Sequence, residues 1–188
     1  MSNYFRCGNK TDKKTAFICS SNAQQLTLPV YMDENIIIKT KLIVPSFINS
    51  DTSIINNEWN VACFALYISG NKYAIRDNPN RVVEAPANPW EIADIEFRTN
   101  TGAVLFNGVS YGGQGGNYNH KNICLFGIEN AHFSCCGFSD LEILKNGVSY
   151  LKLKAMKDDN TGEGYFYDAD NDVSYRSSTL TPLIYAEF

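Results

Sequence analysis

Hydrophobic and polar residues alternate along this chain with a period of two, and no helix-length stretch shows a 3.6-residue period. In residues 36–44, one face would carry Ile36, Ile38, Thr40, Leu42 and Val44, and the other Lys39 and Lys41 beside Ile37 and Ile43. In residues 150–155, the two faces would carry Leu151, Leu153 and Ala155 on one side, and Tyr150, Lys152 and Lys154 on the other. One dry face and one wet face are typical of antiparallel sheets, so the pattern predicts an all-β protein.

Turn-forming residues separate these segments at short intervals. Asn107-Gly108 and Asn146-Gly147 each stand between two strand-like runs, and an Asn-Gly pair tolerates the positive φ angles of a two-residue hairpin. Gly70-Asn71 is a third hairpin candidate, and residues 157–164 and 168–172 are polar breaks between the last strands. Short strands at this spacing predict an antiparallel β-sandwich or jelly roll.

The length of 188 residues is enough for one domain with a hydrophobic core. We expect residues 1–15 to form a flexible N-terminal arm and residues 16–188 to form a single jelly-roll domain. The glycine-rich tract 110–120 is expected to be an exposed loop.

Composition and charge exclude several classes of partner. The formal net charge is −4 and the basic residues are scattered, whereas binding to nucleic acid needs clustered Lys and Arg. No apolar run approaches the length that spans a membrane. Residues 1–14 are polar with no apolar stretch behind them, so we expect no signal peptide and synthesis in the cytoplasm of a host cell.

Six cysteines are present, without the CxxC spacing of zinc sites or thioredoxin motifs, at positions 7, 19, 63, 124, 135 and 136. Cys135 and Cys136 are adjacent, so on a strand they would point to opposite faces. Because a cytoplasm keeps thiols reduced, we expect mostly buried free thiols that pack as small apolar side chains.

Four segments resemble, in their order and spacing, a laminin-G-like, concanavalin A-like jelly-roll module that is widespread in tailed bacteriophages and gut bacteria. They are residues 17–44, 59–75, 90–112 and 122–178. In the last segment, "EILKNG" and "YFYDADNDVSY" stand where the module has "KIYDNG" and a "YD" pair before its final aromatic strand. The resemblance implies a concanavalin A-like sandwich, a fold that hosts lectins, hydrolases and structural modules.

Three carboxylates, Glu91, Asp94 and Glu96, follow a tryptophan in "WEIADIEFRTNTG", residues 90–102. Sandwich glycosidases of the laminarinase type carry Glu-x-Asp-x-Glu on one strand, so that residues i, i+2 and i+4 project from one face. Here position 92 is Ile92, and Glu91 is out of phase with the other two. Two working carboxyls must also lie at defined separations. The pattern favours a solvated strand face and leaves a glycosidase as an alternative.

Asp168, Asp170 and Asp172 alternate like the start of a calcium loop. Such a loop needs glycine at its sixth position and glutamate at its twelfth, where this chain has Val173 and Thr179. An acidic hairpin turn is therefore the favoured interpretation, and we expect no metal site.

The only histidines, His120 and His132, belong to no recognisable nucleophile motif. Cys135 and Cys136 lie near His132 in the sequence, and a thiol nucleophile is the alternative to a filling role. We expect no catalytic residue and no cofactor.

Four aromatic residues are candidates for an interaction surface. Tyr111 and Tyr118 belong to the glycine-rich tract, and Tyr4 and Phe5 belong to the N-terminal arm. Exposed tyrosine offers rigid contact area with a polar tip and is enriched at protein interfaces. An arm of this kind is suited to becoming ordered on binding.

The sequence thus predicts a non-enzymatic virion structural protein of a tailed bacteriophage. It would decorate the capsid or join a head or tail fibre through contacts with capsid, fibre or tail subunits, and a second copy of the chain is a further candidate partner. The alternative is a carbohydrate- or receptor-binding module on the same fold, with residues 110–120 as the ligand surface.

Overall fold

The computed structural model describes residues 14–21, 24–45, 52–57, 64–78, 81–114, 121–128 and 132–188. These residues form 17 strands and no helix, which confirms the all-β prediction. They contain no helix that could cross a membrane. Of the arm predicted at residues 1–15, only Lys14 and Thr15 are described.

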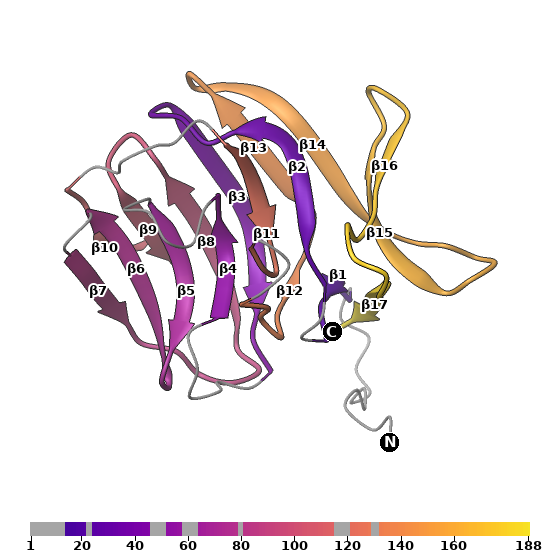
Figure 1. The fold of residues 1–188 in the computed structure, drawn as a ribbon, viewed down its shortest axis with the longest axis horizontal. Coiled ribbons are helices and arrows are strands. Elements are labelled where there is room, and N and C mark those ends of the chain that lie inside the picture. The colour runs from indigo at the N-terminus through magenta and orange to yellow at the C-terminus, as the bar shows by residue number, and fades with distance from the viewer. Residues whose placement is uncertain are drawn as a thin grey trace.

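The strands form two sheets, whose members pair antiparallel throughout (Figure 1). The small sheet has the order β2-β11-β4-β5-β6-β7 and comprises β2 (Leu26–Tyr31), β4 (Thr52–Asn56), β5 (Ala65–Ser69), β6 (Lys72–Asn78), β7 (Arg81–Ala85) and β11 (Asn122–Leu125). The large sheet comprises β1 (Ala16–Cys19), β3 (Ile36–Ile43), β8 (Ile92–Arg98), β9 (Ala103–Phe106), β10 (Val109–Gly112), β12 (Gly137–Phe138), β13 (Leu141–Lys145), β14 (Val148–Lys157), β15 (Glu163–Asp168), β16 (Val173–Tyr175) and β17 (Leu183–Glu187).

The large sheet closes on itself at one end. Its order is β10-β9-β8-β3-β12-β1-β17-β15-β14-β13, with β16 beside β15, and β13 returns to pair with β3. Strand β3 therefore pairs with β8 along one edge and shares its other edge between β12 and β13. The strands β3, β12, β1, β17, β15, β14 and β13 form a closed ring of seven pairings. The sequence predicts a two-layer jelly-roll sandwich without such a ring, and the structure confirms only the all-β, antiparallel part of that prediction.

Alternating burial in β3 and β14 follows the predicted faces except at Ile43, which the pattern assigns to the wet face and which is only 2% exposed. Ile36, Ile38 and Leu42 are fully buried, whereas Lys39 is exposed and Lys41 partly exposed. The same alternation holds in β14, where the buried residues are Leu151, Leu153 and Ala155.

The predicted hairpins form at all three glycine-containing turns. Asn107 and Gly108 connect β9 to β10 with φ angles of 49° and 82°, and Asn146 and Gly147 connect β13 to β14 with 52° and 77°. Gly70 begins the turn between β5 and β6, where Ser69 pairs with Lys72. At the two Asn-Gly turns both residues adopt the left-handed conformation that Asn and Gly accept, whereas at the third turn only Gly70 does, with a φ of 60°.

The core lies between the two sheets and includes aromatic pairs that join them. The ring of Phe64, which precedes β5, stacks on that of Phe97 in β8 with centroids 4.1 Å apart. Tyr73 of β6 stacks on Phe106 of β9 at 4.6 Å. Phe64 and Phe97 are fully buried. Apolar area removed from water in this layer is the main source of stability.

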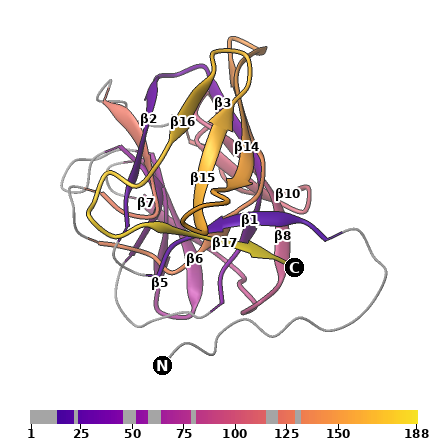
Figure 2. The ribbon, with the colours of Figure 1, turned by 90° about the vertical axis from the view of Figure 1, so that its right-hand side faces the viewer.

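The first and last described segments lie side by side at one end of the molecule (Figure 2). β1 pairs with β17 from Ala16 opposite Glu187 to Cys19 opposite Ile184. Thr15 and Phe188 exchange two backbone hydrogen bonds of 2.9 and 3.1 Å. The chain therefore enters and leaves the described fold at the same place.

Candidate functional site

A groove of about 690 Å³ crosses the outer face of the large sheet, over β3, β8, β9, β13 and β14. Eight charged residues line it: Lys39, Lys41, Asp94, Glu96, Asp140, Glu142, Lys152 and Lys154. We call this set the striped face. The four lysines and four acids give it no net formal charge.

Charge on the striped face alternates in sign from strand to strand. β14 contributes Lys152 and Lys154 and β3 contributes Lys39 and Lys41, whereas the acids come from β8 and from the β12–β13 segment. The register shows one complete row, in which Lys152 pairs with Glu142, Glu142 with Lys39, and Lys39 with Glu96. Opposite charges directly across a sheet attract one another, so the order of signs stabilises an exposed face.

Ion pairs and hydrogen bonds engage the acids of this face. Lys41 Nζ lies 3.1 Å from Asp94 Oδ1. The Arg98 guanidinium donates to the Glu96 carboxylate. Glu142 accepts a hydrogen bond of 2.9 Å from the Ser149 hydroxyl and lies 4.0 Å from Lys152 Nζ.

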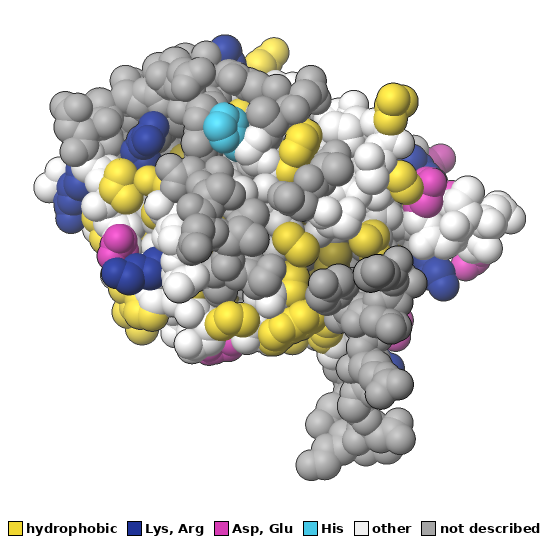
Figure 3. Space-filling view, turned by 60° about the horizontal axis from the view of Figure 1, so that its bottom comes forward, with side chains coloured by type: hydrophobic (Ala, Val, Ile, Leu, Met, Phe, Trp, Pro, Cys, Tyr) yellow, Lys and Arg dark blue, Asp and Glu magenta, His cyan; other side chains and the backbone are white. Residues whose placement is uncertain are grey.

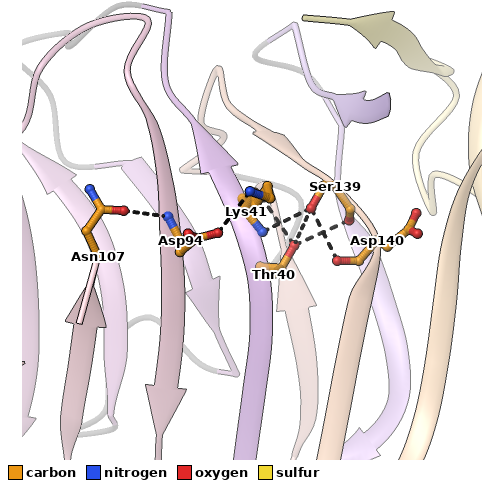
Figure 4. A network of polar contacts seen from close by, with 6 residues as sticks. All are labelled: Thr40, Lys41, Asp94, Asn107, Ser139 and Asp140. Carbon is orange, nitrogen blue, oxygen red and sulfur yellow. Dashed lines mark hydrogen bonds and ion pairs between the residues drawn. The ribbon is translucent and has the colours of Figure 1, made fainter. Parts of the chain in front are cut away.

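Backbone contacts fix the middle of the groove (Figure 4). Asn107 Oδ1 accepts a hydrogen bond of 2.9 Å from the Asp94 backbone N–H, and the Asp94 carbonyl accepts one of 2.8 Å from the Asn107 N–H. Ser139 fills the gap between β12 and β13: its hydroxyl accepts from the Lys41 N–H at 3.0 Å, and its own N–H donates to the Lys41 carbonyl. Asp94, Lys41 and Ser139 are thus held on three neighbouring segments.

Of the three acids in residues 90–102, the structure brings together only two. Asp94 and Glu96 face the groove, as their two-residue spacing predicts. Glu91 precedes β8 and its carboxylate accepts a hydrogen bond of 2.5 Å from the Asn88 amide. It does not line the groove. Asp94 is ion-paired with Lys41 and keeps 71% of its side chain exposed, whereas Glu96 is paired with Arg98 and is 24% exposed.

The acidic hairpin at residues 168–172 uses its carboxylates within the turn. Asp168 is buried, and its side chain accepts hydrogen bonds from the Asp170 and Asn171 backbones and, at 2.7 Å, from the Asn171 amide. Asp172 accepts a hydrogen bond of 2.8 Å from the Tyr167 hydroxyl. No cluster of His, Cys, Asp and Glu that could hold a metal ion occurs within the described part of the chain.

Of the four candidate interaction residues, the structure describes only one. Tyr111 lies on β10, since Ser110–Gly112 belong to a strand and not to the exposed loop predicted there. Its half-buried ring lies edge-on to Phe106 with centroids 6.0 Å apart. Tyr4, Phe5 and Tyr118 lie outside the described residues.

The four described cysteines are thiols and not disulfides, and all except Cys135 are buried. Cys136 Sγ lies 3.1 Å from the Ser134 hydroxyl. Burial raises the pKa of Cys135 and of Cys136, whereas an activated catalytic cysteine has a lowered one. The thiol-nucleophile alternative therefore gains no support.

Comparison with known proteins does not place the chain in a family. No protein-family model matches it, and no curated protein matches it.

The sequence did not predict the striped face as a unit. Alternation placed Lys39, Lys41, Lys152 and Lys154 on outer faces, but their acidic neighbours depend on which strands pair. The hairpin at Asn146 makes β13 a neighbour of β14, and this could have been inferred. The insertion of β3 between β8 and β13 joins segments that are far apart in the sequence, so it could not have been inferred from the sequence.

Proposed function

We propose that the chain is a non-enzymatic structural protein of a tailed-bacteriophage virion, built on a concanavalin A-like (laminin-G-like) jelly roll. It attaches to capsid, fibre or tail subunits through protein–protein contacts. The ordered resemblance of residues 17–178 and the two antiparallel sheets support this fold assignment.

The observation that carries the proposal is the pairing of the groove acids. A sandwich glycosidase needs one carboxylic acid to protonate the leaving oxygen and a second carboxylate to attack or to activate water. Here Asp94 is paired with Lys41 and Glu96 with Arg98, while Glu91 contacts Asn88. This arrangement suits a surface that holds its shape and makes contacts.

Deletion of residues 2–13 tests the mode of attachment. Thr15 is hydrogen-bonded to Phe188, so a deletion that ends at residue 13 spares the described fold. Phage carrying the truncated gene should incorporate at least tenfold less of this protein into particles, while the purified domain keeps its melting temperature. Full occupancy by the truncated protein would contradict attachment through the arm.

The second candidate is a carbohydrate-binding module, and the size of the groove favours it. A volume of about 690 Å³ falls within the range of small-molecule sites. Wild-type protein and the Asp94→Asn, Glu96→Gln double variant would be applied to a glycan array, with Glu91→Gln as the matched control outside the groove. Binding that is lost only in the double variant would replace the structural proposal with the lectin one.

A further inference from the structure

Two thiols, from Cys19 of β1 and from Cys135 just before β12, lie on the outer face of the closed ring. Cys19 pairs with Gly137 across β1 and β12, and Cys135 precedes Gly137 by two residues. Side chains two residues apart in extended chain project to the same side. A Cβ atom at Gly137 would lie 2.6 Å from Cys19 Sγ, so this sulfur occupies the space that the glycine leaves open.

A small cavity of about 10 Å³ lies beside the two thiols. Cys19 and Cys135 line it together with Trp90, Pro45 and Phe188. Figure 3 views the molecule with its lower end forward, and hydrophobic side chains are visible at the surface near the centre of this face. Trp90 is 44% exposed, so part of the cavity wall is in contact with solvent.

The two thiols differ in their exposure to solvent and in whether their backbone is held in a strand. Cys19 is 5% exposed and is held in the β1 ladder. Cys135 is partly exposed and lies outside any strand. Its neighbour Cys136 is anchored, because the Cys136 carbonyl accepts a hydrogen bond of 2.8 Å from the Ser20 N–H. The Cys135 side chain is thus the one that can meet a reagent and shift toward Cys19.

We propose that Cys135 and Cys19 form a redox-modification site, at which a small disulfide such as oxidised glutathione converts the two thiols into a disulfide linking β12 to β1. The Cys135 thiolate attacks one sulfur of the small disulfide, whose S–S bond breaks and releases one thiolate. The Cys19 thiolate then attacks the Cys135 sulfur, forms the Cys19–Cys135 bond and releases the second small thiolate. The two leaving thiolates take up the two protons, so the protein is oxidised by two electrons and the small disulfide is reduced.

The buried surroundings of the two thiols make this oxidation slow, and it depends on the pH and on the redox state of the medium. Burial raises the pKa of Cys19 to about 12, and the charge of a nearby Cys135 thiolate adds to the rise. The thiolate is the reactive form. The rate of oxidation should therefore rise about tenfold for each unit by which the pH is increased, as long as the pH stays below the pKa values of the thiols. A glutathione-reduced cytoplasm would keep both thiols free, and an oxidising medium outside the cell would close the link. This use after release rests on the proposed virion role, whereas the site itself rests on the pairing of β1 with β12 and on the cavity that both cysteines line.

The test uses the full chain, purified with reductant and then exposed to oxidised glutathione at pH 8. Free thiols are alkylated, and peptides are mapped by mass spectrometry. We expect a product lighter by two hydrogens that carries a Cys19–Cys135 cross-link. Its melting temperature should be higher by roughly 5–15 °C, since the link closes a long loop, and reductant should reverse the change.

Matched variants separate this site from the other thiols. Cys19→Ser should stop at a mixed disulfide on Cys135, Cys135→Ser should stay reduced, and Cys124→Ser should behave like wild type because Cys124 lies on β11. Cys135 is partly exposed, so Cys135→Ser should fold even if Cys19→Ser does not.

A Cys135–Cys136 link, a link from either thiol to Cys7 or Cys63, or no link at all would overturn the proposal. None of these outcomes bears on incorporation into particles, so the two proposals fail separately.

Discussion

The ammonium of Lys41 lies 3.1 Å from a carboxylate oxygen of Asp94, directly across the pairing of β3 with β8. This contact is one unit of the striped face, where columns of lysines and of acids alternate over β14, β13, β3 and β8. The pattern explains how a sheet face can carry eight charges without strong repulsion. It also gives a structural role to Asp94 and Glu96, two of the three acids in the sequence that suggest a glycosidase.

The energetic coupling between Lys41 and Asp94 should be small. Their side chains are 45% and 71% exposed, so water and salt screen the pair, and the coupling free energy should be below about 1 kcal/mol. Urea unfolding of Lys41→Ala, Asp94→Ala and the double variant measures it, with Lys39→Ala as a control on the same strand. A coupling above about 2 kcal/mol would contradict a solvated face.

Loss of the Phe97 ring should damage the core far more than loss of a side chain on the same strand that faces out. Phe97 is fully buried against Phe64 at 4.1 Å, so Phe97→Ala should lower the free energy of unfolding by about 3–5 kcal/mol. Ile92 is 36% exposed, and Ile92→Ala should cost about 1 kcal/mol or less. Chemical unfolding of both variants checks the ranking, and equal losses would mean that β8 has been assigned the wrong buried face.

The glycine at position 164 should resist substitution because another strand crosses close to it. A Cβ atom there would lie 2.8 Å from the Ile184 carbonyl carbon and 2.9 Å from the Tyr185 nitrogen. Gly164→Ala should therefore separate β15 from β17 and destabilise the protein by about 1–3 kcal/mol. Lys157 faces Gly164 across β14 and β15 and is exposed, so Lys157→Ala is the control and should be near neutral. An unchanged melting temperature for Gly164→Ala would argue against this closure of the ring.

Acid should weaken the hydrogen-bonded ion pair between the β14–β15 turn and Arg176. Hydrogen bonds from the Thr161 backbone and then from the Arg176 guanidinium lower the pKa of Asp158. A lowered carboxyl pKa in the folded state gives stability that is present above the unfolded pKa and is lost as pH falls through the folded one. The difference in melting temperature between wild type and Asp158→Asn should thus be largest near neutral pH and should shrink below about pH 4. A difference that grows on acidification would contradict this sign.

Local features of the fold could be predicted, because they depend on neighbouring residues. The Asn107-Gly108 and Asn146-Gly147 hairpins follow from the conformational freedom of those two residue types. The buried face of β3 follows from strict alternation.

Features set by contacts between distant segments could not be predicted. The pairing of β1 with β17 joins opposite ends of the chain and leaves no periodic signal. Tyr111 was predicted to lie in a loop because glycines surround it, yet its backbone pairs with Val104 on β9. The proximity of Cys19 to Cys135 depends on the short strand β12, whose two residues carry no recognisable strand pattern.

The central claim is that this chain is a structural component of a particle. Quantitative mass spectrometry of density-purified phage particles from a strain carrying the gene tests it most directly, with the host lysate as the reference. We expect the chain to co-purify with the major capsid or tail proteins at a fixed ratio after high-salt washing. Its absence from intact particles, with the protein recovered only in the soluble lysate, would contradict the account.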